Sequence, residues 1–192
     1  MKQREDRRVR YTRMVLRESL VKLLAQKTVA QVSVTELCEM ADINRATFYA
    51  HYSDPQDLLR SIESELIDDI NTFLATFSFD GGDAPVGLLQ QVFSYIKENH
   101  QVCAVLLADN GDIAFQRDVA GIVSAQCIKR LTDERRADAR AAEYIYLYAS
   151  TGSVGLIQRW LADGMRETPA EMAALVSALV SRGMSAFYEK QP

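Results

Sequence analysis

The stretch SVTELCEMADINRATFYAHY, residues 33–52, constrains the fold more than any other part of the chain. Ser33, followed three residues later by a glutamate, is a capping box, in which the two side chains satisfy backbone N–H groups of the first helical turn. Apolar residues then recur at helical spacing until a turn at residues 42–44. Asn44 is a good N-cap for a second helix that begins at Arg45. Two short helices joined by a tight turn predict a helix-turn-helix.

The second of these helices carries side chains suited to the major groove of DNA. Phe48 and Tyr52 lie four residues apart and face inward, so the polar and small residues between them point elsewhere. The forked guanidinium of Arg45 matches guanine O6 and N7, and Thr47 offers a hydroxyl or a methyl group. We predict DNA contacts at Thr35, Asn44, Arg45, Ala46, Thr47, Tyr49 and His51.

Within this set the side chains have different roles. Ala46 can lie against a thymine methyl group, which is a base contact. Tyr49 and His51 are assigned to phosphates, and such contacts fix register without carrying sequence information directly. Taken singly, Arg45 is also explained as a solvated charge and His51 as a packed histidine. Their order along one short helix favours DNA recognition.

The distribution of charge supports the same interpretation. The whole chain carries 22 Lys and Arg against 26 Asp and Glu, a net charge of −4. Residues 1–30 hold nine basic and three acidic side chains, so this segment is +6 and residues 31–192 are −10. Basic groups gathered beside a helix-turn-helix are the expected electrostatic footprint of a DNA-binding protein. A solvated basic helix is the alternative.

The rest of the chain indicates an all-α fold of about nine helices. Four prolines and few alternating runs rich in Val and Thr argue against strands. No apolar run approaches the roughly eighteen residues that span a bilayer, and we identify no targeting segment. We expect helices over residues 8–26, 55–77, 85–98, 100–108, 112–131, 136–163 and 169–188, in addition to the two within residues 33–52.

The segment NRATFYAHYSDPQDLL, residues 44–59, resembles the recognition segment of the TetR/AcrR family of bacterial transcription regulators. The resemblance implies a helix-turn-helix DNA-binding domain at 1–53 and a helical effector-binding and dimerisation domain at 54–192. Two residues depart from the family pattern. Asp42 stands where a glycine is usual, at a position that needs positive φ. Pro55 stands where the family has a lysine that contacts a phosphate.

One recognition helix reads only a few base pairs, so specificity requires two copies on a palindromic site. Glycine inside a helix costs about 1 kcal/mol relative to Ala, and close approach of another helix compensates for it. TetR-like proteins pair through their last two helices as a four-helix bundle, although packing inside one subunit is the alternative here. We predict a homodimer interface at Gly152, Gly155, Leu156, Trp160, Leu175 and Leu179.

An effector site is inferred more loosely. Two phenols and a hydroxyl recur at helical spacing over residues 144–151, and the TetR-like pocket lies among helices four to eight. Plain core packing explains aromatic residues equally well, and several relatives act without a known ligand. For a small apolar or aromatic effector we predict Phe73, Phe77, Phe93, Leu106, Phe115, Gln126, Tyr144, Tyr148 and Thr151.

The predicted function is a dimeric, cytoplasmic transcriptional regulator, a repressor that an effector releases from double-stranded DNA. The alternatives are an activator and a helical interaction module with a degenerate DNA-binding head. An enzyme is disfavoured, because GSVG at 152–155 lacks the G-x-S-x-G pattern. Three cysteines without CxxC spacing suit a reducing compartment. We expect no metal site, no cofactor and no membrane partner.

Overall fold

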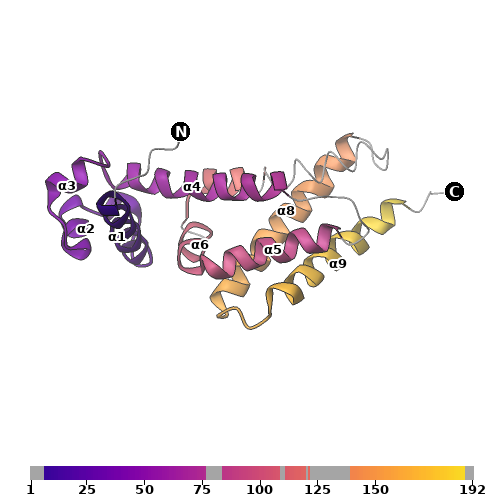
Figure 1. The fold of residues 1–192 in the computed structure, drawn as a ribbon. Coiled ribbons are helices and arrows are strands. Elements are labelled where there is room, and N and C mark those ends of the chain that lie inside the picture. Colours follow the sequence, from indigo (N-terminus) through magenta and orange to yellow (C-terminus); the bar gives the residue numbers. More distant parts are fainter. Residues whose placement is uncertain (1–6, 77–83, 109–110, 120, 122–138, 189–192) are drawn as a thin grey trace. The chain divides into compact units, whose positions relative to one another are not determined.

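The computed structural model describes residues 7–76, 84–108, 111–119, 121 and 139–188 (Figure 1). Within these ranges the regular elements are helical, which confirms the all-α class. Residues 113–119 are also helical. The other elements are α1 (Arg7–Leu24), the 3-10 turn η1 (Val29–Gln31), α2 (Val34–Ala41), α3 (Arg45–Tyr49), α4 (Pro55–Thr76), α5 (Ala84–Glu98), α6 (His100–Leu106), α8 (Ala139–Ala162) and α9 (Pro169–Tyr188).

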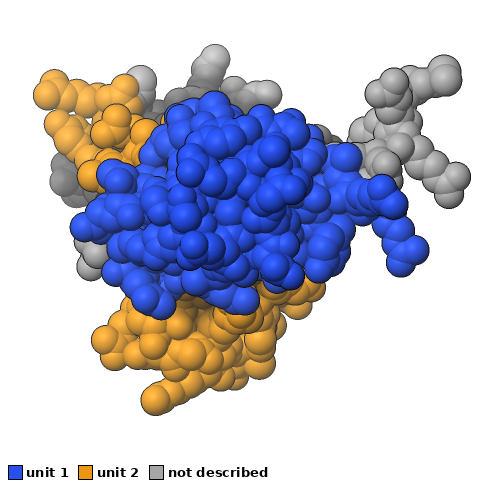
Figure 2. All heavy atoms as spheres, turned by 90° about the vertical axis from the view of Figure 1, so that its left-hand side faces the viewer, with its two compact units in different colours: residues 1–68 blue, residues 69–192 orange. Residues whose placement is uncertain are grey.

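The chain separates into two compact units, Met1–Asp68 and Asp69–Pro192 (Figure 2). The division falls inside α4, because the first half of this helix is attached to α1. Arg17 of α1 forms an ion pair with Glu65 of α4, with 2.9 Å between Nη1 and Oε2. The functional boundary predicted between residues 53 and 54 stays a prediction.

Unit 1 has a small core shared by its helices. Leu16 and Leu20 of α1, Leu37 of α2, Phe48 of α3 and Leu58 of α4 are almost completely buried. Burying a side chain of this size stabilises a fold by about 1.5–3 kcal/mol. Four helices, α1 to α4, thus anchor one residue or more in a common core, which holds the short α3 at the surface.

The predicted helix starts are confirmed by their capping geometry. Asn44 Oδ1 accepts a hydrogen bond from the Thr47 N–H at 2.7 Å, and Asp54 Oδ1 accepts from the Asp57 N–H at 2.7 Å at the start of α4. Thr168 opens α9 with both halves of a capping box. At Ser33 only one half forms as predicted, because the Glu36 carboxylate accepts a hydrogen bond from Lys27 Nζ.

In unit 2, α5 and α9 lie side by side (Figure 1). Phe93 of α5 meets Trp160 of α8 edge to face, with ring centroids 5.4 Å apart. The Trp160 indole N–H donates to the Glu167 carbonyl at 3.1 Å. Gln158 of α8 donates to the carbonyl of Leu107 at 2.6 Å and so caps the end of α6. Trp160 thus joins α8 to α5, and Gln158 joins α8 to the end of α6.

The described ranges lack a membrane-spanning helix and a metal-binding cluster. None of the helices there is both long enough and apolar enough to cross a membrane. Nor do those residues hold a group of three or more His, Cys, Asp or Glu side chains that could bind a metal ion.

Candidate nucleic-acid interface

The five-residue helix α3 presents polar side chains on the outside of a buried anchor. Phe48 is 0% exposed and Tyr52 is 8% exposed, as their inward assignment predicts. Tyr49, between them, is 51% exposed. The seven residues predicted to contact DNA all reach the surface of unit 1: Thr35, Asn44, Arg45, Ala46 and Tyr49 are exposed, and Thr47 and His51 are half-buried. Their contact with DNA stays a prediction.

Asn44 and Thr47 are engaged with each other at the start of α3. Asn44 Oδ1 accepts from the Thr47 N–H at 2.7 Å and from the Thr47 hydroxyl at 3.0 Å. This arrangement orients the helix and restricts both side chains. Arg45 is therefore the side chain of this segment with the most donors left for a base edge.

Arg45 and Tyr49 form a pair that residue-by-residue reasoning missed. Arg45 Nη2 donates to the Tyr49 hydroxyl at 3.4 Å, and the guanidinium carbon lies 5.9 Å from the centroid of the Tyr49 ring. Residues four apart are neighbours on a helix surface, so this spacing was the available signal. The pair places the guanidinium beside the helix instead of leaving it to sample solvent.

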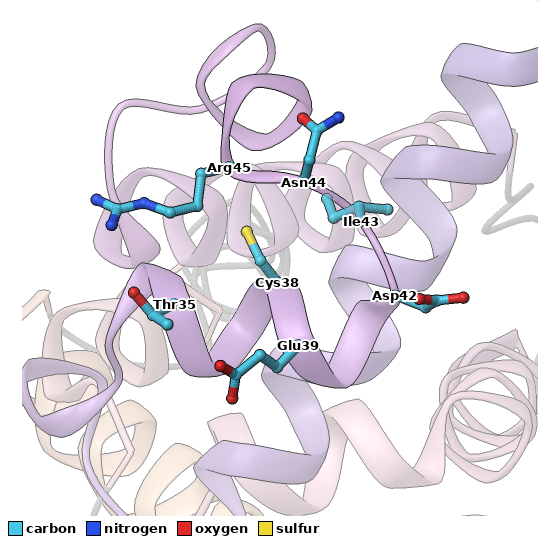
Figure 3. A pocket seen from close by; sticks show the side chains of 7 residues that line it. All are labelled: Thr35, Cys38, Glu39, Asp42, Ile43, Asn44 and Arg45. Atoms are coloured by element: carbon cyan, nitrogen blue, oxygen red, sulfur yellow. The ribbon is translucent and has the colours of Figure 1, made fainter.

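A hollow of about 490 Å³ lies between α2 and α3. Cys38 points from α2 toward the backbone that carries Asn44 and Arg45 (Figure 3). Burial raises the pKa of the Cys38 thiol, and the Arg45 charge only partly opposes this. The thiol is therefore protonated at neutral pH and behaves as a core group. The lining residues are Thr35, Cys38, Glu39, Asp42, Ile43, Asn44 and Arg45.

The turn that precedes α3 has the conformation predicted for residue 42. Asp42 has φ 52° and ψ 47°, the left-handed region that favours glycine. Its N–H donates to the carbonyls of Cys38 and Glu39, and the Ile43 N–H donates to the Cys38 carbonyl at 3.0 Å. These bonds end α2 in the manner of a left-handed C-cap. The aspartate therefore preserves the turn that a glycine would make.

Pro55 is the first residue of α4, where a missing N–H costs nothing. The neighbouring Asp57 carboxylate accepts from the Ser53 N–H at 2.9 Å and from its hydroxyl at 3.1 Å. These hydrogen bonds hold the pKa of Asp57 below its usual range. The start of α4 is thus well capped, but position 55 offers no positive charge to a phosphate.

The basic residues of the N-terminal segment divide into two groups. Arg17 is paired with Glu65, and Lys27 is paired with Glu36, so both side chains hold unit 1 together. Arg7, Arg8, Arg10 and Arg13 are exposed on the first two turns of α1. Four exposed arginines therefore lie at the beginning of α1, and Lys22 is exposed in its last turn.

The residues predicted for an effector site fall into different environments. Phe93, Leu106 and Phe115 are buried in unit 2, each at most 6% exposed. Tyr144 and Tyr148 are 64% and 73% exposed on α8, and Thr151 is also exposed. These two groups therefore do not line one enclosed cavity in the single chain. Phe77 and Gln126 lie outside the described residues, as does the side chain of Phe73.

The residues predicted for a dimer interface are also divided. Gly152 and Gly155 are exposed, and a Cβ atom built on either would meet nothing within 4 Å. Leu175 and Leu179 are 45% and 50% exposed, and Leu156 is half-buried. Trp160 differs from the prediction. It is 2% exposed and packs on Phe93, so its own chain leaves it no surface for a partner.

Comparison with known proteins decides the family. Residues 83–182, just over half of the chain, match the TetR-type model described as the transcriptional regulator C-terminal region. The chain belongs to the TetR family. Members of this family are transcription regulators and not enzymes, which removes the enzyme alternative.

Individual relatives agree with the TetR assignment. The uncharacterized HTH-type transcriptional regulator YxbF of Bacillus subtilis is 25% identical over 182 residues, which cover 88% of this chain and 44% of YxbF. This chain thus spans less than half the length of that curated relative.

Two solved structures share the fold. The fatty acid degradation regulator FadR from Bacillus halodurans gives a TM-score of 0.71 at 10% identity, over 90% of this chain and 96% of that one. FadR from Bacillus subtilis, solved in complex with stearoyl-CoA, gives 0.69 at 12% identity, over 88% and 98%. Identities this low establish the fold alone.

Proposed function

We propose that this chain is a cytoplasmic homodimeric repressor that binds a palindromic operator through α3 and leaves it when a small apolar effector binds. The observation that carries the proposal is the exposed Arg45 on a helix anchored by the buried Phe48. The arginines at the start of α1 supply positive charge for phosphates within the same unit. In this proposal α3 contacts the bases, and the arginines at the start of α1 contact the phosphates.

Dimerisation is supported by side chains that the single chain leaves exposed. Leu175 and Leu179 lie four residues apart on α9, so both face the same side of the helix and remain about half exposed. The glycines of α8 have open space around them, although each weakens its helix by about 1 kcal/mol. A second copy packed against α8 and α9 would cover the leucines and use the open space.

The proposed effector acts by preferring one arrangement of the dimer. A ligand can shift DNA affinity only by the difference in its affinity for the DNA-bound and released states. Stearoyl-CoA is bound by the Bacillus subtilis FadR, a protein of this fold, so fatty acyl-CoAs form the first group of compounds to test. A transcriptional activator is the alternative to a repressor, since both require the same DNA-binding surface.

The proposal is tested by selecting binding sites for the full chain from a random duplex library. We expect a palindrome whose half-sites lie about one helical turn (34–36 Å) or a multiple of it apart. We expect log affinity to fall steeply with log salt concentration, because phosphate contacts release counterions. In the selected site, Arg45→Ala should reduce discrimination against a replaced guanine by about 5- to 150-fold.

A chain that enriches no sequence and binds DNA with a flat salt dependence would instead be a helical interaction module with a degenerate head. Effector binding is measured separately, by DNA release and by fluorescence of Trp160, the single tryptophan. Since Trp160 is buried beside Phe93, a ligand in unit 2 should change its emission. Release of DNA by an acyl-CoA without such a change would place the effector elsewhere.

A further inference from the structure

The two ends of α3 are joined by one side-chain pair. Arg45 is the first residue of this helix and Tyr49 is the last. The guanidinium donates to the phenol oxygen at 3.4 Å and lies against the ring, 5.9 Å from its centroid. Because the helix has only five residues, this is the one i,i+4 pair that it contains.

Tyr49 is held from the other side by the core. Its ring meets the Phe48 ring edge to face, with centroids 5.5 Å apart and an interplanar angle of 80°. Phe48 is 0% exposed, so its own ring cannot shift without disturbing the core. Tyr49 is therefore a semi-rigid support, although half of its surface is exposed to solvent.

The support is electrically neutral, and this matters for Arg45. The carboxylates of Glu39 and Asp42 line the same hollow, yet the hydrogen bond that the Arg45 guanidinium makes within the described residues is to Tyr49. Figure 3 shows the Asp42 carboxylate and the Arg45 guanidinium pointing to opposite sides of the hollow. A carboxylate partner would compete with guanine for the same donors. A phenol leaves most of the five N–H donors and the full charge available.

We propose that Tyr49 is a positioning residue that holds the Arg45 guanidinium ready to read a guanine, in place of the phosphate contact first predicted for it. The proposal rests on the proposed function and adds the residue that sets its specificity. Arginine has many rotamers, and a side chain ordered before binding loses less freedom when it docks. Tyr49 therefore acts on discrimination between sequences and acts only through Arg45.

The two roles for Tyr49 predict different measurements. Loss of a phosphate contact weakens binding to every sequence by the same factor. Loss of positioning weakens binding to the site that contains the guanine more than to a site where it is replaced. Once Arg45 is replaced, loss of the positioning role no longer changes the difference in affinity between the two sites. A double-mutant cycle with Arg45 separates the two roles.

The experiment uses the full chain, the selected palindrome and a matched duplex in which the guanine read by Arg45 is replaced. Tyr49→Phe removes the hydroxyl and keeps the ring, and Tyr49→Leu removes both. We expect Tyr49→Leu to reduce discrimination by about 2- to 5-fold, as exposed cation–π and i,i+4 pairs suggest, and Tyr49→Phe to reduce it less. In the Arg45→Ala background neither substitution should change discrimination. Tyr95→Phe, at a tyrosine of unit 2 assigned neither to DNA nor to the effector, is the matched control.

Equal weakening on both duplexes, repeated in the Arg45→Ala background, would overturn the positioning role in favour of a phosphate contact. A sequence-specific protein whose discrimination is unchanged by Arg45→Ala would also overturn it, while the proposed function would stand. If no duplex is selected at all, it is the proposed function that fails. Unchanged thermal unfolding of the Tyr49 variants excludes a folding defect as the cause.

Discussion

The surface of α3 and the surface formed by α8 and α9 are both exposed, but they expose different chemistry. On α3 the outward side chains are polar except for Ala46, and the apolar Phe48 beneath them is completely buried. On α8 and α9 the outward side chains include Leu147, Leu175 and Leu179, each 45–59% exposed. A polar surface with donors needs no protein partner to be stable in water. The exposed leucines are the apolar surface that we propose a second copy covers.

The two surfaces differ in whether a single chain is sufficient to form them. Unit 1 has its own caps and its own core, so α3 is presented by a single chain. The α8–α9 surface in unit 2 has glycines with open space and leucines without full burial, and this is where we propose that a second copy packs. Substitutions on either surface test this difference.

The largest effect is expected from Phe48→Ala. Removing a completely buried phenylalanine should destabilise unit 1 by about 3–5 kcal/mol, the sum of lost burial and the remaining cavity. Hydrogen exchange of α1 to α3 measures this loss, and DNA binding should disappear with it. For hydrogen exchange alone, Tyr49→Ala is the control, because half of that side chain is already in water. Equal protection of α3 in wild type and Phe48→Ala would contradict a core anchor.

The next effect is expected from Leu179→Glu. If α8 and α9 pair with a second copy, a charge at the interface should weaken the dimer by at least about 2 kcal/mol. If the chain works alone, the same change at a half-exposed position should alter stability by less than about 0.5 kcal/mol. Sedimentation equilibrium distinguishes these cases, with Ala162→Glu at the exposed end of α8 as the control.

Gly155→Ala tests the same surface, because it should have opposite effects on the stability of the monomer and of the dimer. In one chain, alanine should strengthen α8 by about 1 kcal/mol, because the space around the glycine is open. In a closely packed dimer the added methyl group should push the two copies apart. We expect more stable monomers and weaker dimers, measured by thermal unfolding at two protein concentrations. A gain in stability at both concentrations would argue against close approach at this position.

Asp42→Gly should stabilise unit 1 by about 0.5–1 kcal/mol, since an L side chain is disfavoured at φ 52°. Met165, with φ 56° after α8, is the matched position in unit 2. Met165→Gly should stabilise its own unit without affecting DNA binding. Chemical unfolding followed by circular dichroism reports the helices of both units together, whereas Trp160 fluorescence reports unit 2, so a shift in the first signal alone is assigned to unit 1. Destabilisation by Asp42→Gly would mean that the carboxylate has a role beyond the turn.

The smallest effect concerns acid stability at the start of α9. The Thr168 N–H and hydroxyl donate to the Glu171 carboxylate and hold its pKa below the ordinary value of 4.5. Because the pKa of the Glu171 carboxyl is lower in the folded state, its hydrogen bonds contribute their full stabilisation at pH values above the ordinary pKa. The stabilisation is lost as the pH falls through the folded value. Glu171→Gln should therefore lower the melting temperature at neutral pH, and the difference should vanish in strong acid.

Capping residues in the sequence predicted where the helices begin, because the hydrogen bonds of an N-cap are local. Asn44, Asp54 and Thr168 each bond to a backbone N–H three residues on, a contact that needs no distant part of the chain. Side chains that bind across elements were not predictable in this way. Gln158 caps the end of α6 from a position 51 residues away, and no spacing rule connects the two.

The sequence by itself determined the helical class, the turn at Asp42 and the outward set on α3, because all three depend on neighbours within a few residues. Only the tertiary structure decided between core and surface in unit 2. The 3.6-residue period identifies an apolar side of a helix but cannot say what covers it. Trp160 is buried by Phe93 of its own chain, whereas Tyr148, three turns earlier on the same helix, stays exposed. That choice depends on which helices meet, and only packing determines it.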